Sequence, residues 1–209
     1  MKKEIIPAII AKSQKEMEER INHVKDAVEW LQLDVMDGKF VPNTSLNFDI
    51  ILPKTSCRYE AHLMVSNPEE WIIKNHEKVD IIIAHFESSK NPGKVIELIK
   101  SKDKKASFAI NPETTVEKIK PYLNKLDHIL VMTVNPGFYG SKFLPETLAK
   151  VTELRSLRPQ MEIEVDGGIT DETIAQADSS GANLFVSGSF IQKNSRTKDA
   201  VGKLRSLLS

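Results

Sequence analysis

Short runs of apolar and β-branched residues recur along the chain and predict eight β-strands. In the second run, alternate side chains point to opposite faces of a strand, which places Gln32, Asp34 and Met36 together on one face. The eight predicted strands are Glu4–Ile10, Leu31–Met36, Arg58–Met64, Asp80–His85, Ala106–Ile110, His128–Thr133, Glu162–Val165 and Asn183–Ser187.

The intervals between these runs have helical spacing and recognisable start signals. Ser13 is a potential N-cap for a charged amphipathic stretch that reaches Val28, and prolines stand at the start of several later stretches. Only the second interval lacks a long helical pattern, and residues 48–52 are expected to form one or two helical turns there. The other predicted helical stretches are 13–28, 67–74, 91–99, 111–123, 145–157, 170–177 and 197–208.

Strand and helix signals alternate at a spacing of roughly 20–30 residues, which predicts a parallel sheet with right-handed crossovers. Eight such units in one domain favour a closed (β/α)8 barrel of the TIM type. An open doubly wound sheet is the alternative, but no GxGxxG motif follows the first strand. No linker or low-complexity segment interrupts the chain, so residues 1–209 are expected to form a single α/β domain.

The amino-acid composition limits the binding partners and the cellular compartment to be expected for this protein. Lys+Arg and Asp+Glu number 29 each, so no overall field would attract nucleic acid or an acidic membrane. Cys57 is the single cysteine, which excludes an intramolecular disulfide and suits a reducing compartment. The N-terminal apolar run is interrupted by Pro7, and no later run approaches ~18 apolar residues. We therefore expect a cytoplasmic protein without a membrane or nucleic-acid partner.

Polar residues stand at the ends of several predicted strands, and in a barrel these ends share one face. Asp34, His62 and Asp166, from the second, third and seventh strands, would converge there. Histidine with carboxylates is a suitable oxygen and nitrogen ligand set for a metal ion. Two carboxylates on opposite sides of a substrate also suit the removal and return of a proton. Taken singly, a histidine after an apolar run is usually a packed or hydrogen-bonded residue, and Asp34 could cap a loop.

Glycines follow the last two predicted strands. Gly167 and Gly168 come after the seventh strand, and Gly188 with Ser189 comes after the eighth. Glycines let backbone N–H groups approach an anion without help from lysine, and barrels often bind phosphate between these two loops. Two tight turns are the alternative, but the paired placement favours an anion site.

The segment after the sixth strand, 135–141, has two glycines around an aromatic pair. Such a loop would form a lid over a ligand, or it would be an exposed connection, and spacing does not choose between the two. The candidate lid residues are Gly137, Phe138, Tyr139 and Gly140.

Several long motifs resemble those of the ribulose-phosphate 3-epimerase family, in the same order and over nearly the whole chain. They are LDVMDGKFVPN at 33–43, AHLMVSNPEEW at 61–71, VMTVNPGFYGSKF at 131–143, EVDGGI at 164–169 and SGSFI near the end, with support from HFE at 85–87 and AINPETTVE at 109–117.

This resemblance implies a (β/α)8 barrel that interconverts ribulose 5-phosphate and xylulose 5-phosphate. It implies that Asp34 and Asp166 act as acid and base, and that both bind a divalent metal (Zn, Mn, Fe or Mg) together with His62. It further implies a homo-oligomer and a sugar-phosphate substrate. The residues that match the family's shielding methionines, lid and phosphate contacts are Met36, Met64, Met132, Gly137–Gly140, Gly167, Gly168, Gly188 and Ser189.

Three positions depart from the family pattern. The family has a histidine metal ligand at Gln32, a serine at Ala8 and commonly a glycine at Tyr139. Three outcomes follow for Gln32: a harder metal such as Mn²⁺ or Mg²⁺, a metal-free site in which the amide stabilises the intermediate, or a protein that only binds a sugar phosphate. Ala8 would also leave room for a hexulose 6-phosphate.

Overall fold

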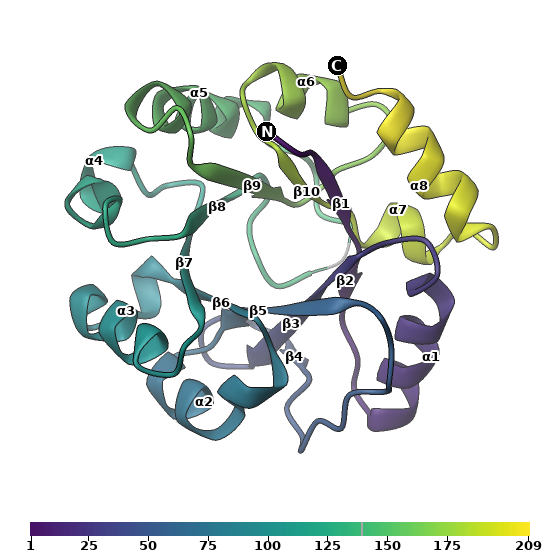
Figure 1. Cartoon of the computed structure of the whole chain (residues 1–209), viewed down its shortest axis with the longest axis horizontal. Coiled ribbons are helices and arrows are strands. Elements are labelled where there is room, and N and C mark those ends of the chain that lie inside the picture. Colours follow the sequence, from purple (N-terminus) through teal and green to yellow (C-terminus); the bar gives the residue numbers. More distant parts are fainter. Residues whose placement is uncertain (139) are drawn as a thin grey trace.

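The computed structural model describes residues 1–138 and 140–209, and they form a ring of strands surrounded by helices (Figure 1). The predicted fold class, a (β/α)8 barrel, is confirmed. No helix in this described part is long and apolar enough to cross a membrane. The barrel strands are β1 (Glu4–Ile6), β2 (Ala8–Ile9), β3 (Trp30–Asp37), β5 (Arg58–Met64), β6 (Ile81–His85), β7 (Lys105–Ile110), β8 (His128–Met132), β9 (Glu162–Asp166) and β10 (Leu184–Val186).

The ring closes through its first strand, which Pro7 divides into β1 and β2. Proline has no backbone N–H to donate, so the ladder is interrupted at this residue. β1 pairs with β10 and β2 pairs with β3, both in parallel, while the carbonyl of Pro7 accepts a hydrogen bond from the Gln32 backbone N–H at 3.1 Å. One divided strand therefore joins both ends of the sheet.

The predicted helical stretches all contain a helix. The Ser13 hydroxyl accepts a hydrogen bond from the Glu16 backbone N–H at 3.3 Å and so caps α1 as expected. In the fourth stretch the α-helix starts only at Val116, and it continues as a 3₁₀ turn that contains Pro121. The helices are α1 (Gln14–Val24), α2 (Pro68–Asn75), α3 (Pro92–Lys100), α4 (Val116–Ile119), α5 (Leu148–Leu157), α6 (Ile174–Ser179), α7 (Ser189–Gln192) and α8 (Thr197–Ser206), with 3₁₀ turns at His76–Lys78, Phe86–Ser88, Lys120–Tyr122 and Pro145–Thr147.

The expectation of helical turns at 48–52 is wrong. Ile51 donates its backbone N–H to the Gln14 side-chain oxygen at 3.1 Å, and its carbonyl accepts from the Gln14 amide at 2.6 Å. These bonds with α1 use the backbone groups that a local helix would pair internally. A two-residue strand, β4 (Thr44–Ser45), was not predicted either, and it pairs antiparallel with β3.

The strands have two buried faces. One faces the helices and forms the larger apolar core, whereas the other faces the barrel interior and mixes apolar with polar side chains. Trp30 packs against both interior apolar clusters. The fully or almost fully buried polar side chains of the barrel strands are Glu4, Gln32, Asp34, Glu60, His62, His85, Ser107, His128 and Glu164.

Asp37, the last residue of β3, ties two loops at the mouth of the barrel together. Its carboxylate accepts hydrogen bonds from the backbone N–H groups of Lys39 and Phe40 at 2.8 and 2.9 Å. It also accepts from the backbone and hydroxyl of Ser66, which follows β5, at 2.8 and 2.6 Å. Burial alone would raise the pKa of Asp37, but these four bonds lower it to about 2.

We predict that Asp37→Asn destabilises the fold by about 1–2 kcal/mol at pH 7, because charge-assisted hydrogen bonds become neutral ones. The native pKa lies below the ordinary carboxyl value, so the charged group stabilises the fold above about pH 4, and this stabilisation is lost as the pH falls toward 2. Urea unfolding of both proteins across this range would measure the difference. A constant gap between them down to pH 2 would contradict this role for the charge.

Candidate active site

A pocket lies at the C-terminal ends of the barrel strands and gathers most of the predicted site residues. Tyr139 lies outside the described residues, and His62 is fully buried beneath the pocket rather than in its wall. The predicted residues that line the pocket are Asp34, Met36, Met64, Met132, Gly137, Phe138, Gly140, Asp166, Gly167, Gly168, Gly188 and Ser189. Ala8, which the family resemblance places near the substrate, also lines the pocket, as do Pro136 and Ser141 of the candidate lid segment. Ile10 and Ile169 line it without having been predicted as site residues.

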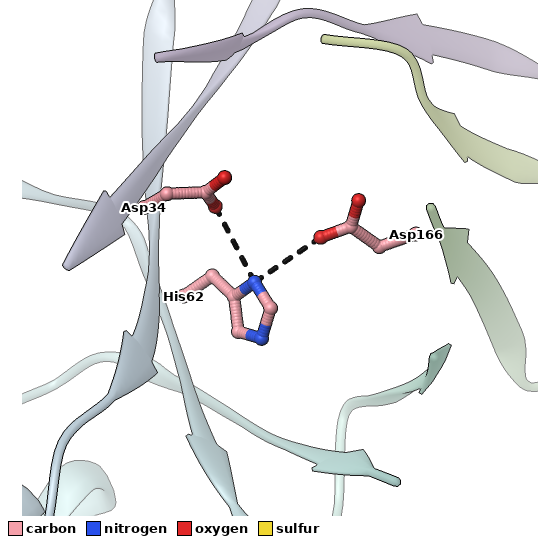
Figure 2. A group of neighbouring side chains, drawn as sticks. All are labelled: Asp34, His62 and Asp166. Atoms are coloured by element: carbon pink, nitrogen blue, oxygen red, sulfur yellow. Dashed lines mark ion pairs between the residues drawn. The ribbon is translucent and has the colours of Figure 1, made fainter. Parts of the chain in front are cut away.

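At the centre, the His62 ring lies between the two aspartates (Figure 2). Its Nδ1 is 3.3 Å from Asp34 Oδ1 and 3.2 Å from Asp166 Oδ2. The three residues come from β5, β3 and β9, so the barrel brings together side chains that are far apart in the sequence. The structure thus brings together the three residues that were predicted to converge at the strand ends.

Gln32 spans the same two carboxylates. It precedes Asp34 by two residues and therefore lies on the same face of β3. Its Nε2 donates to Asp34 Oδ1 at 2.9 Å and to Asp166 Oδ2 at 2.8 Å, and lies 3.4 Å from His62 Nδ1. Its Oε1 is buried and has no hydrogen-bond partner among the described residues. The amide thus presents its donor side to the aspartates and leaves its acceptor unused.

The charges of this group depend on one another. Burial raises the pKa of Asp34 to about 6, with a further increase from Asp166, although the bond with His62 opposes the shift. Burial alone would lower the pKa of His62, but its bonds with Asp166 and Asp34 outweigh burial and raise the pKa to about 10. In this arrangement an imidazolium lies between the carboxyl groups and offsets their charge.

His85 and Glu87 support His62 from the opposite side, and neither was among the predicted site residues. His62 Nε2 is 2.9 Å from His85 Nε2, and His85 Nδ1 is 3.3 Å from Glu87 Oε2. Glu87 also accepts from the Asn111 backbone N–H at 2.8 Å and the Thr114 hydroxyl at 2.5 Å.

The protonation states of His85 and Glu87 follow from their burial and their hydrogen bonds. Burial lowers the pKa of His85 to about 4, so its ring is neutral. Burial would raise the pKa of Glu87, but its bonds with His85, Thr114 and Asn111 lower it to about 2. His85 therefore donates Nδ1–H to Glu87 and accepts Nε2–H from His62, which directs His62 Nδ1 toward the aspartates. A histidine at a strand end, two residues before a glutamate, was the available sequence signal.

The residues of this centre fit a divalent cation. Asp34, His62 and Asp166 each offer one ligand atom, and these atoms all lie within 4.8 Å of one another. Two carboxylate oxygens and one imidazole nitrogen suit zinc, manganese or iron. The Gln32 nitrogen cannot be a ligand, but a half-turn of the amide exchanges Nε2 for the unpartnered Oε1 and presents a fourth ligand atom, an oxygen.

The glycines at the other end of the pocket are required by geometry. Gly167 has φ +118°, and a Cβ there would overlap the side chain of Val134. Gly168 has φ +66°, and a Cβ there would lie 2.9 Å from the Cβ of Phe143. The described pocket lining contains neither lysine nor arginine, so an anion bound at this end would depend on backbone N–H groups.

The loop after β8 contributes one wall of the pocket through Pro136, Gly137 and Phe138. Asn43 donates its side-chain amide to the carbonyl of Gly137 at 2.9 Å, while the Phe138 side chain is 55% exposed. The segment therefore is anchored at one point and carries an exposed aromatic ring beside the opening. Its closure as a lid stays a prediction.

Comparisons with known proteins agree with this architecture. The family model described as the ribulose-phosphate 3 epimerase family matches residues 4–192. A ribulose-phosphate 3-epimerase of Eremothecium gossypii is 37% identical, over 96% of this chain and 91% of that protein. A protein of Oryza sativa subsp. japonica named as the cytoplasmic isoform of this enzyme is 38% identical, over 87% of this chain and 83% of that protein.

Among solved structures, a 3-hexulose-6-phosphate synthase superposes with a TM-score of 0.71 over 99% of this chain and 100% of that one. At 15% identity this likeness supports the barrel fold alone. The family match covers almost the whole chain and both relatives cover most of their own length, which confirms the predicted membership and the isomerase class. The chain belongs to the ribulose-phosphate 3-epimerase family.

Proposed function

We propose that this protein interconverts ribulose 5-phosphate and xylulose 5-phosphate by inverting carbon 3. The observation that carries the proposal is the pair of carboxyl groups, Asp34 and Asp166, which come from β3 and β9, line one pocket and contact the same two donors. Membership in the epimerase family supports the substrate class.

The reaction requires a proton to leave C3, next to the C2 carbonyl, and another to arrive on the opposite face. One aspartate accepts the first proton and the other donates the second, so their roles exchange with the direction of reaction. Burial brings the pKa of Asp34 to about 6, closer to neutrality than an ordinary aspartate. Both protonation states of Asp34 are therefore accessible near pH 7, as such a role requires.

Negative charge develops on the O2 and O3 oxygens of the enediolate that forms between the two proton transfers. Met36, Met64 and Met132 line the pocket together with the aspartates and would exclude water from this region once substrate is bound. Electrostatic stabilisation is stronger where water is excluded. His62 and Gln32 hold both carboxyl groups in place, so proton transfer does not require the aspartates to reorganise.

Asp34, His62 and Asp166 would hold a divalent metal in this site. When bound, the cation supplies positive charge for the two substrate oxygens on which the negative charge develops. Loading requires His62 to lose its Nδ1 proton, and Gln32 must turn its amide oxygen inward to become a ligand. Because an amide oxygen is a harder ligand than imidazole, we propose that Gln32 shifts the preference from Zn²⁺ toward Mn²⁺ or Mg²⁺.

The phosphate of the substrate would bind at the glycine-rich end of the pocket, near Gly167, Gly168, Gly188 and Ser189. We also propose a cytoplasmic location, in line with the name of the rice relative. The homo-oligomer implied by the family resemblance stays a prediction.

The direct test is exchange of the C3 proton of ribulose 5-phosphate in D₂O, followed by NMR with formation of xylulose 5-phosphate. We predict that Asp34→Asn and Asp166→Asn each lower kcat by about 10²–10⁴-fold, because an amide cannot accept or return the proton. Asp103→Asn, at an exposed turn, is the matched control and should leave the rate unchanged. Wild-type turnover in either single aspartate variant would refute the two-aspartate mechanism.

The same assay separates the rival functions. Ala8 lines the pocket where the family has serine, so a hexulose 6-phosphate should be compared with the pentulose at equal concentration. Faster epimerisation of the hexulose would reassign the substrate. Binding of both without exchange would indicate a sugar-phosphate-binding protein, and the double change Gln32→His and Ala8→Ser should then restore activity.

We predict that Gln32→His raises the affinity for Zn²⁺ at least tenfold, because imidazole replaces an amide that now donates to the ligand carboxylates. Competition with a chromogenic chelator would measure the affinity, and elemental analysis would give the stoichiometry. Gln176→His, on the exposed surface of α6, controls for adventitious binding to an added histidine. Equal Zn²⁺ affinities of wild type and Gln32→His would show that residue 32 lies outside the ligand set.

For the phosphate end, Gly168→Ala should raise KM for the sugar phosphate about tenfold with a smaller effect on kcat, since the strained backbone would move the anion-binding N–H groups. Inhibition by inorganic phosphate should weaken in parallel. Gly202→Ala, in α8 where a Cβ meets nothing within 4 Å, is the matched control. A KM that does not change would place the phosphate elsewhere.

A further inference from the structure

A second polar cluster lies inside the barrel, one layer below the aspartates. It consists of Glu60 on β5, His128 on β8 and Glu164 on β9, which are at most 1% exposed. Glu60 precedes His62 by two residues and Glu164 precedes Asp166 by two, so both point into the interior as their neighbours do. The cluster is thus farther from the pocket than the catalytic layer and shares no residue with it.

The geometry of the cluster is that of a ligand set. His128 Nε2 lies 2.8 Å from Glu164 Oε2. One ligand atom from each of the three residues lies within 4.8 Å of the others, as in the catalytic centre. Two carboxylates and one imidazole are suitable ligands for a divalent transition-metal ion.

Several polar atoms here are left without a partner among the described residues. They are Oε1 of Glu60, Oε1 of Glu164 and Nδ1 of His128, all of them buried. The Ser107 hydroxyl is also fully buried and unpartnered, and Ser107 is the register partner of His128 on the neighbouring strand β7. Ser107 shares its strand face with Ala109, which packs inside the barrel, so its hydroxyl points into the interior beside the cluster.

Charge balance points to the same kind of ligand. Burial raises the pKa of both Glu60 and Glu164, so their protonated forms are favoured unless a cation compensates them, and no lysine or arginine is buried in the described part of the chain to do so. A metal ion would take the place of these protons. The formal charges of a divalent cation, two carboxylates and a neutral imidazole sum to zero. Buried polar groups that lack partners require an explanation, and a bound ion is one that also satisfies the charge balance.

We propose that Glu60, His128 and Glu164 form a second site, structural in role, for a divalent transition-metal ion, with the Ser107 hydroxyl beside it. Below the site, Trp30 packs against the interior clusters, and the Arg58 guanidinium covers its ring at 4.5 Å. Above it lies the layer of Asp34 and His62, into which the side chain of Gln32 reaches. An ion in this position enters as the barrel folds and is released only when it opens.

The test counts metal ions after refolding. Wild type and an Asp34→Asn/Asp166→Asn double variant, which disables the upper site, are unfolded in guanidinium with EDTA and refolded with Zn²⁺ or Co²⁺. After desalting against chelator, elemental analysis should find one ion per chain in the double variant. Adding His128→Leu should abolish it, together with the visible absorption of the Co²⁺ form. His23→Gln, on the surface of α1, is the matched histidine control and should keep the ion.

A second substitution, Glu164→Gln, keeps the test valid if His128→Leu does not fold, as circular dichroism would show. Loss of the ion in either folded variant, with slow extraction by EDTA from the folded parent, supports the site. A refolded double variant without metal would overturn the proposal and leave the two glutamates sharing a proton. So would an ion that persists in both cluster variants.

Discussion

Negative charge buried inside a closed sheet is the constraint on which the rest of this structure depends. Asp34, Asp166, Glu60 and Glu164 all point into the barrel, where water cannot solvate them fully. An isolated carboxylate in such a place would take up a proton or prevent folding. In the upper layer, His62 supplies a compensating charge and Gln32 supplies a donor to each aspartate. The protonation states of the two aspartates therefore depend on this local balance of charge.

Because every second side chain of a strand points into the barrel, the buried polar groups lie in layers. Residues 32 and 34, 60 and 62, and 164 and 166 form three pairs that stack along the barrel axis. The Gln32 side chain is long enough to reach from its own layer to the oxygens of the next. A change at residue 32 therefore acts directly on the carboxyl groups of Asp34 and Asp166, although its backbone lies deeper than theirs.

Much of this arrangement is readable in the sequence. The alternation of strands and helices predicted the barrel, and the Ser13 cap and the strand-end residues followed from local chemistry. Local signals did not reveal the division of the first strand or the contact between Gln14 and Ile51, because both depend on tertiary partners. His85 was visible as a strand-end residue, but its hydrogen bond to His62 depends on the lateral spacing of β5 and β6. Sequence periodicity carries no information on that spacing.

The closure of the ring by β1 and β10 has a consequence for the biosynthesis of the protein. These strands lie near opposite ends of the chain, and the parallel ladder is continuous only when both are present. A ribosome-bound chain that lacks β9 has no Asp166, and one that lacks β10 has an open sheet edge beside the future pocket. The proposed proton transfer thus becomes possible only after β9 and β10 have both been synthesised, and the unfinished sheet needs protection from aggregation until then.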